Sequence, residues 1–293
     1  MRPYLIALTL FILSISKAQV LDNFSDGNFT ANPGWSGDAD KFTVDNEELK
    51  SNSNIVSDVF YLSTPSTLVK GDLEWRFRVN LKFSTSGANY TDVYLVADNE
   101  NLEEVLNGYF IRVGNIKDEI SLYKVLGGTQ TQLTNGRDSK THNKDINVKV
   151  TKGAFGSWAI SADYTGGTTF ENEGTAKDND ITTSSHFGFL IKQSTSSFHL
   201  KHFFDDIYVG PQIVDKKKPS INSATAINDS VIVLTTDELV RTIGTSFLLN
   251  NGYGSPSNVQ VDGSTISLTY ATKFINNSYE LSITTLSDLK GNI

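Results

Sequence analysis

The 293-residue chain contains no cysteine, so its fold cannot rest on disulfides. Beyond the amino-terminal segment it also lacks any apolar run near the roughly 18 residues that a membrane-spanning helix needs. Stability must therefore come from a sizeable buried core, with bound metal ions as a further source. At about 100–200 residues per domain, the length predicts two domains.

Positive charge is also scarce, because 25 Lys and Arg face 33 Asp and Glu, for a net charge of −8. A surface of this sign repels phosphate backbones, which argues against nucleic-acid binding through a broad basic field. The four histidines belong to no Cys/His cluster, and no H-E-x-x-H motif or phosphate-binding glycine loop occurs. The sequence therefore predicts no nucleic-acid partner and no zinc-hydrolase chemistry.

The amino-terminal segment has the features of a secretory signal peptide. Arg2 provides a basic start, residues 5–15 form an apolar run too short to cross a bilayer, and the small residues Ser16 and Ala18 stand at the −3 and −1 positions of a cleavage site. The sequence therefore predicts a signal peptide over 1–18 and a mature chain that is secreted or held at the cell surface, with no transmembrane segment.

Period-two alternation predicts long antiparallel strands. In 72–83 (DLEWRFRVNLKF) every second residue is apolar, and the residues between them are polar or charged. The strand therefore has one apolar face, and Trp75 and Phe77 on that face are expected to pack in the core. Trp158 of a later strand is expected to do the same. Helix signals are limited to a turn within 98–108. This pattern indicates an all-β sandwich or jelly roll. Further strands are predicted over 41–51, 55–62, 91–98, 108–114, 119–125, 145–151, 156–164, 186–192 and 198–210, while 172–180 is predicted to be a loop.

The character of the chain changes after residue 210. Residues 211–218 begin with a proline and contain a basic run, which is typical of an exposed linker. A smaller unit over 219–293 then has the size and rhythm of an immunoglobulin-like sandwich, and the preceding unit spans 19–210. Strands of the smaller unit are predicted over 230–236, 264–270 and 278–286.

This smaller unit resembles the bacterial Ig-like modules of the S-layer-protein type. The resemblance rests on VIVLTTDELV (231–240), on a strand–Asp–Gly–strand hairpin in VQVDGSTISLTY (259–270), and on the closing LSITTLSDLKGN (281–292). In that family another strand normally follows this close. The resemblance therefore implies that the chain is one end of a longer protein, truncated in its last domain.

The first unit resembles concanavalin A-like or carbohydrate-binding-module jelly rolls of the kind secreted by Bacteroidetes. The resemblance rests on the opening LDNFSDGNFTANPGWSGD (21–38) and the closing strand FFDDIYVG (203–210). It implies that the two ends are neighbours, that the unit recognises a polysaccharide or cell-surface glycan, and that a structural calcium lies between the opening turn and an Asp of the last strand. Those families commonly have Glu after the opening Phe, where this chain has Ser25 and then Asp26.

The adjacent acids Asp205 and Asp206 are the centre of the predicted metal site. Calcium takes six to eight oxygen ligands, which carboxylates and turn carbonyls provide, and acids buried without a cation would be costly. Asp22 and Asp26 of the opening segment complete the expected set. Because alternation along a strand sends Asp205 and Asp206 to opposite faces, one of them is expected to bind. The alternative is that both are ordinary edge-strand acids, one capping a turn.

Arginines and tyrosines on the polar sides of the strands are candidate glycan-binding residues. Tyrosine rings stack on sugars, and guanidinium groups donate hydrogen bonds to hydroxyls or acidic groups. The alternative is that the arginines form cross-strand ion pairs that solvate a sheet. The predicted ligand-binding residues are Arg76, Arg78, Tyr94, Arg112 and Tyr123.

No motif for catalysis is present. A double-displacement glycoside hydrolase needs two carboxylates about 5–5.5 Å apart, which one strand provides as E-x-D-x-E or E-x-D-x-x-E, and neither pattern occurs. The leading hypothesis is therefore an exported, non-catalytic, glycan-binding or adhesive module with an Ig-like spacer. Two alternatives stay open: a purely structural envelope or adhesive protein, and a polysaccharide-acting enzyme whose carboxylates come from separate strands.

Overall fold

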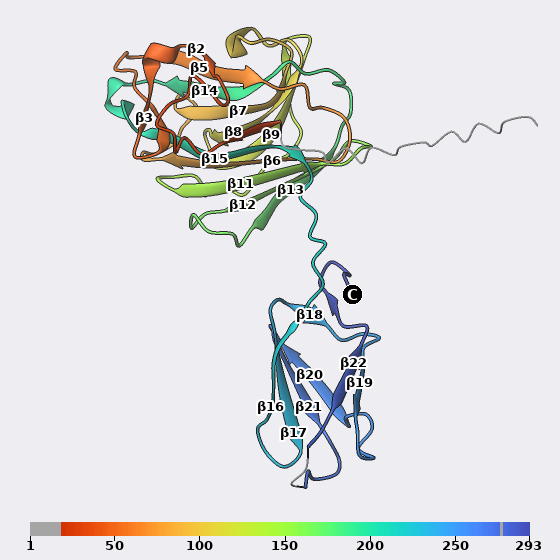
Figure 1. The fold of residues 1–293 in the computed structure, drawn as a ribbon. Coiled ribbons are helices and arrows are strands. Elements are labelled where there is room, and N and C mark those ends of the chain that lie inside the picture. Colours follow the sequence, from red (N-terminus) through yellow and green to blue (C-terminus); the bar gives the residue numbers. More distant parts are fainter. Residues whose placement is uncertain (1–18, 276–277) are drawn as a thin grey trace, which may run out of the picture. The chain divides into compact units, whose positions relative to one another are not determined.

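The computed structural model describes residues 19–275 and 278–293, so the predicted signal peptide, 1–18, lies outside the described residues. The chain divides into two compact units between Ile213 and Val214, and each is described by itself (Figure 1). Both units consist of strands, which confirms the all-β prediction. Helical structure in the described residues is limited to the short 3-10 turns Ala39–Lys41, Leu102–Glu104 and Ser196–Phe198.

The first unit is a sandwich of two antiparallel sheets, which Figure 1 shows as facing layers. Sheet one has the order β13-β12-β11-β6-β15-β4-β3, and β1 pairs with β15. Its strands are β1 (Val20–Asp22), β3 (Phe42–Asp45), β4 (Glu48–Ser51), β6 (Leu73–Leu81), β11 (Asp145–Lys152), β12 (Ser157–Asp163), β13 (Glu171–Lys177) and β15 (His202–Pro211). Sheet two has the order β10-β9-β8-β7-β14-β5-β2. Its strands are β2 (Ser36–Gly37), β5 (Asp58–Pro65), β7 (Tyr90–Ala97), β8 (Gly108–Gly114), β9 (Glu119–Leu126), β10 (Thr129–Gln132) and β14 (His186–Gln193).

The main core lies between these sheets and is rich in aromatic side chains. Trp75 of β6 stacks on Trp158 of β12 with ring centroids 5.6 Å apart, and Phe189 of β14 stacks on Phe204 of β15 at 4.2 Å. All four are buried, as is Phe77, so the predicted core positions of Trp75, Phe77 and Trp158 are confirmed. Aromatic burial of this extent supplies the stability that disulfides would give a smaller domain.

Most strands lie near the predicted positions, and three predictions need correction. The segment 41–51 is not one strand but a hairpin of β3 and β4, which pair with each other. The prediction of a loop over 172–180 is wrong, because β13 occupies Glu171–Lys177. It pairs with β12, and the register shifts at a bulge between Ile160 and Ser161. Gly174 and the exposed polar residues of this edge strand give no alternating apolar pattern, so the sequence did not predict it. The last strand begins later than predicted, because Ser196–Phe198 form a turn capped by the Thr195 side chain.

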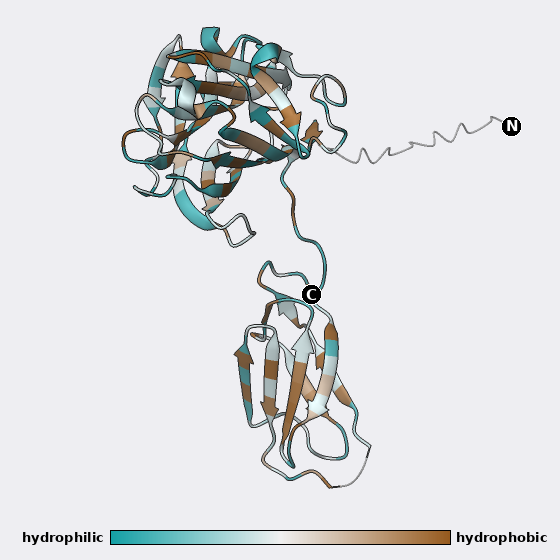
Figure 2. Ribbon diagram, turned by 90° about the vertical axis from the view of Figure 1, so that its left-hand side faces the viewer, coloured by the Kyte–Doolittle hydropathy of each residue, from teal (hydrophilic) through white to brown (hydrophobic). Residues whose placement is uncertain are grey.

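The second unit is a smaller β-structure with its own core. A four-stranded sheet has the order β16-β17-β21-β20, and two ribbons pair β18 with β23 and β19 with β22. The predicted Asp–Gly hairpin is confirmed by the pairing of β20 with β21. Figure 2 shows apolar bands alternating with polar ones along these strands. The strands are β16 (Ile221–Ala226), β17 (Val231–Thr236), β18 (Val240–Arg241), β19 (Ser246–Leu249), β20 (Asn258–Asp262), β21 (Thr265–Thr269), β22 (Leu281–Thr284) and β23 (Ser287–Asp288).

The described residues contain no helix with the length and apolar character needed to cross a membrane.

Lys152 at the end of β11 is a charged side chain placed in the core. It is 1% exposed, its Nζ donates to Asn179 Oδ1 at 2.9 Å, and it lies 5.8 Å from the Trp158 ring centroid. Desolvation lowers the pKa of the amine. Its long apolar stem fills space in the core near Trp158, while the charged amine is costly to bury.

We expect Lys152→Met to lower the free energy of unfolding by no more than about 1 kcal/mol, or to raise it. Methionine keeps the shape of the lysine stem, and the substitution removes the desolvated amine. Lys152→Ala should cost about 2–4 kcal/mol through the cavity it leaves. Denaturant unfolding followed by tryptophan fluorescence measures both, since Trp35, Trp75 and Trp158 all lie in the first unit. An equal loss in both variants would instead assign the stability to the amine's hydrogen bond.

Candidate functional site

A pocket of about 430 Å³ lies beside β1, where the first and last strands of the first unit meet. Asp22 of β1 pairs with Ile207 of β15, so the predicted proximity of the two ends is confirmed. The rim carries Leu21, which is 68% exposed, and no Lys or Arg lines the space. The polar lining residues are Asp22, Asn23, Ser25, Asp26, Asn32, Asp206 and Tyr208.

A bulge in β15 separates the two adjacent acids. The register shifts between Asp205 and Tyr208, and Asp206 adopts φ 52°. Asp206 lines the pocket, whereas Asp205 Oδ2 lies 3.7 Å from Arg78 Nη1 on the sheet surface. Partial burial raises the pKa of Asp205 to about 6. The bulge thus places Asp206 with Asp22 and Asp26 and leaves Asp205 outside this group.

Asp22 organises the opening turn. Its Oδ1 accepts from the Phe24 backbone N–H at 2.9 Å and its Oδ2 accepts from Trp35 Nε1 at 2.8 Å, with the side chain 8% exposed overall. Burial raises the pKa of Asp22, and the two hydrogen bonds oppose that rise. Asp26 is exposed, and its Oδ1 caps the Asn28 N–H at 3.1 Å. Asp22 therefore anchors the pocket wall, while Asp26 and Asp206 present free carboxylate oxygens.

The donor set of this pocket fits calcium in chemistry, since all its ligand atoms are oxygens. Its three carboxylates are more widely spaced than a compact site requires. Among the described residues, one group of three acidic side chains brings one oxygen of each within 4.8 Å of the others, and that group is in the second unit. Calcium in the pocket would therefore need carbonyl oxygens and water in addition to Asp22, Asp26 and Asp206.

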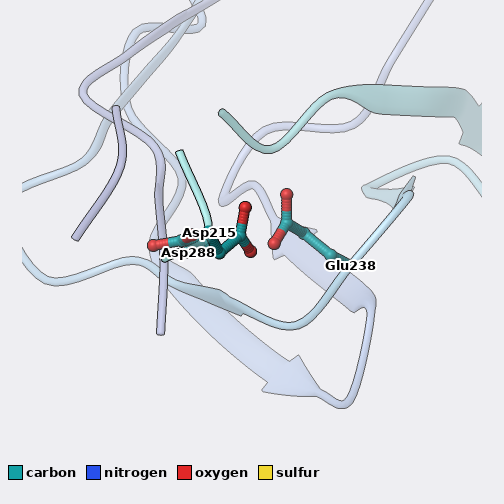
Figure 3. A group of neighbouring side chains, drawn as sticks. All are labelled: Asp215, Glu238 and Asp288. Atoms are coloured by element: carbon teal, nitrogen blue, oxygen red, sulfur yellow. The ribbon is translucent and has the colours of Figure 1, made fainter. Parts of the chain in front are cut away.

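The compact group consists of Asp215, Glu238 and Asp288, called here the carboxylate cluster (Figure 3). Asp288 is 1% exposed, and its Oδ1 accepts from the backbone N–H groups of Lys290 and Asn292 at 2.7 and 2.8 Å. Desolvation, followed by the charges of Asp215 and Asp288, raises the pKa of Glu238. The sequence analysis missed this cluster, because its members are up to 73 positions apart.

Arg112, Tyr94 and Tyr123 of the predicted ligand-binding set belong to one aromatic cluster on sheet two. Arg112 Nε and Nη2 donate to Asp92 Oδ1 and Oδ2, both at 2.7 Å. Its guanidinium carbon lies 4.1 Å from the Tyr90 ring centroid and 5.0 Å from that of Tyr123. Tyr94 and Tyr123 are 4% and 9% exposed, so little of either ring is open to a ligand.

Arg76 and Arg78 lie on β6 of sheet one, apart from the other three residues. Arg76 Nε donates to Glu74. Arg78 donates to Asp145 at 2.6 and 2.8 Å and to Glu48. The predicted set is therefore divided between two sheets. Arg78 and Arg112 make the cross-strand ion pairs of the alternative hypothesis, whereas Arg76 pairs with Glu74 of its own strand. Asp92 and Tyr90 were missed, although Asp92 directly opposes Arg112 once β7 and β8 are paired.

No protein-family model and no curated protein sequence matches the chain.

Solved structures match it in fold. The exoplasmic/lumenal domain of VIP36, in its Ca²⁺/Man3GlcNAc-bound form, matches 69% of this chain and 92% of its own at a TM-score of 0.54 and 12% identity. The carbohydrate-binding module CBM66 from Bacillus subtilis matches 61% and 96% at 0.46 and 14% identity. The legume lectin-like domain from Entamoeba histolytica matches 70% and 100% at 0.48 and 10% identity. At these identities the likeness concerns fold: the chain contains an all-β jelly-roll sandwich similar to that of the VIP36 lumenal domain.

Proposed function

We propose that the chain is an exported, non-catalytic module that recognises a glycan through its first unit, and that its second unit is an Ig-like spacer. The observation that carries this function is the pocket beside β1. It is concave, about 430 Å³ in volume, and lined by carboxylates, amides, a hydroxyl and a tyrosine. The VIP36 domain, which is similar in fold, is known in a Ca²⁺/Man3GlcNAc-bound form, which supports the same class of ligand here.

The lining matches the chemistry of a sugar. A pocket of this size accommodates about one or two hexose units, and its convergent polar groups would fix their orientation. Asp26 and Asp206 accept hydrogen bonds from hydroxyls, while the Asn23 and Asn32 amides both donate and accept. With acids and no base in the lining, an anionic sugar would be repelled. Neutral glycans are therefore the favoured ligands.

Calcium belongs to this proposal through Asp22, Asp26 and Asp206. The ion would supply positive charge among three carboxylates and would pin the opening turn to the last strand. Asp205 takes no part in this set, because it pairs with Arg78 across β15 and β6 and its Oδ2 lies 3.7 Å from Arg78 Nη1.

An array of neutral and acidic oligosaccharides, probed with residues 19–293, tests the function. We expect binding to neutral glycans, loss of that binding in Asp206→Asn, and retention in Asp205→Asn, which removes the same charge one residue away and outside the pocket. Incubation of the bound glycans should release no reducing sugar. Binding to no glycan would favour the structural alternative, and reducing-sugar release would favour the enzyme.

A further inference from the structure

We propose that β16, an edge strand of the second unit, pairs antiparallel with β16 of a second copy of this chain, so that two four-stranded sheets join into one. β16 is hydrogen-bonded to β17 on one side, and among the described residues no strand pairs with its other side. Figure 1 shows β16 at the margin of the second unit, beside β17. The pairing concerns this unit alone and does not depend on glycan binding.

The free side of β16 carries backbone groups that point away from β17. Directly after the strand, the Ile227 N–H donates to the Val231 carbonyl at 3.0 Å. Hydrogen-bonded pairs alternate with non-hydrogen-bonded pairs in an antiparallel ladder, so Thr225 also directs its backbone groups at β17. The N–H and C=O groups of Ala224 and Ala226 therefore point outward. An added strand would bond to them as β17 bonds to the inner side.

β16 lacks the features by which exposed edge strands normally avoid pairing, which are charges, prolines and bulges. Its sequence, INSATA, contains no charged residue and no proline, and all six residues are exposed. By contrast, the edge strand β13 of the first unit carries Glu171 and Lys177, and β20, at the opposite edge of the same sheet as β16, ends in Asp262. The register shift in β16 lies at its start, between Ile221 and Ser223, and the rest of the strand is regular.

The strand is complementary to itself. Hydrogen-bonded pairs between two copies must join residues whose backbone groups point outward in both, and a two-fold axis at Ala224 meets this condition. Ala224 then lies opposite Ala224 of the second copy, and Ser223 lies opposite Thr225 of the second copy. The side chains that meet on both faces of the joined sheet are small and uncharged, so no repulsion opposes this register.

Charge favours the antiparallel arrangement. The basic run 216–218 precedes β16 and Asp229 follows it. Lys216 and Lys218 are exposed and take part in none of the ion pairs found among the described residues, while Asp229 pairs with Lys273 and keeps a side chain that is 52% exposed. In an antiparallel pair the start of each strand lies beside the end of the other, so Lys218 of one copy comes near Asp229 of the other. The net charge of −8 opposes association elsewhere on the chain, and β16 with its oppositely charged ends suits a second copy.

The consequence for recognition rests on the proposed function, whereas the pairing does not. Two paired copies carry two pockets beside β1. A surface that displays many copies of one glycan would hold such a pair more tightly than a single chain, because the second binding event is intramolecular. A dimer that binds no glycan would leave the pairing intact and remove only this consequence.

Cysteine cross-linking tests the pairing, because the chain has no cysteine of its own and any disulfide must join two copies. Opposed residues of a hydrogen-bonded antiparallel pair have Cα atoms about 5.5 Å apart, within the range of about 4.4–6.8 Å that a disulfide spans. We expect Ala224→Cys in residues 19–293 to form a covalent dimer under mild oxidation. Gln260→Cys, at the centre of the opposite edge strand β20, is the matched control and should stay monomeric.

Charged substitutions at Ala224 test the register without a covalent link. In sedimentation equilibrium, the apparent mass of the wild type should rise toward that of a dimer as the concentration increases. Ala224→Lys and Ala224→Glu should each weaken the dimer by roughly fivefold or more, because position 224 lies opposite itself and like charges repel. An equal mixture of the two variants should restore it, which also shows that both are folded.

Three results would overturn the pairing. The first is a wild type that stays monomeric at all concentrations. The second is equal cross-linking of Ala224→Cys and Gln260→Cys. The third is a dimer that neither charged variant at Ala224 weakens, which would place the contact between copies elsewhere on the chain.

Discussion

Replacing Asp92 by leucine is expected to lower the free energy of unfolding of the first unit by about 3–5 kcal/mol. Asp92 is 2% exposed, and the Arg112 side chain that holds it is 12% exposed. Loss of the carboxylate leaves a guanidinium desolvated between the Tyr90 and Tyr123 rings, without the two 2.7 Å hydrogen bonds that satisfied it. The cost comes mainly from this uncompensated charge, not from the net value of the pair.

A double-mutant cycle separates these contributions. Arg112→Met alone should also destabilise, because it strands the buried Asp92 carboxylate. The Asp92→Leu/Arg112→Met double variant should recover most of the loss, since no buried charge remains. Urea unfolding followed by tryptophan fluorescence gives the three values. If Asp92→Leu costs less than about 1 kcal/mol, the pair is solvated and Arg112 is open to ligands after all.

Acidification is expected to destabilise the first unit through His202. The side chain is 0% exposed, its Nδ1 lies 3.1 Å from Ser51 Oγ, and its Nε2 has no hydrogen-bond partner among the described residues. Burial lowers the pKa of His202 from 6.5 to about 3. Between these values the unfolded chain binds the proton and the folded chain does not, so stability falls as the pH falls below 6.5. The expected loss is about 1.4 kcal/mol per pH unit, or roughly 2 kcal/mol at pH 5.

The measurement is the free energy of unfolding of the first unit from pH 7 to 4. In His202→Leu, the free energy of unfolding should depend less steeply on pH below 6.5, by about 1.4 kcal/mol per pH unit. His142→Gln, which changes an exposed histidine, should leave it unchanged. Parallel curves for the wild type and His202→Leu would show that carboxylates alone govern the acid sensitivity.

The core strands could be predicted because their side chains alternate without interruption. The strand predicted over 72–83 corresponds to β6, and the strand predicted over 108–114 is β8 with the same bounds. β13 escaped detection, because Glu171, Asn172 and Gly174 give an edge strand no apolar periodicity. Its assignment depends on the neighbouring β12, which the local sequence does not specify.

The candidate sites were predictable only in part, for a related reason. The pairing of β1 with β15 followed from the two ends of the first unit. Alternation predicted that one of Asp205 and Asp206 would belong to the site, but not which one. The structure places Asp206 at the pocket beside a bulge, and period-two alternation contains no signal for a bulge. The carboxylate cluster is assembled by tertiary contacts between distant segments, so no local spacing reveals it.

Calorimetric titration of the best neutral oligosaccharide from the array into the wild type, Asp206→Asn and Asp205→Asn tests glycan recognition most directly. The pocket beside β1 predicts a measurable Kd for the wild type, a value within about twofold for Asp205→Asn, and binding weakened at least roughly tenfold for Asp206→Asn, which corresponds to about 1.4 kcal/mol or more. Equal affinities for all three proteins would place recognition outside the pocket and contradict the assignment.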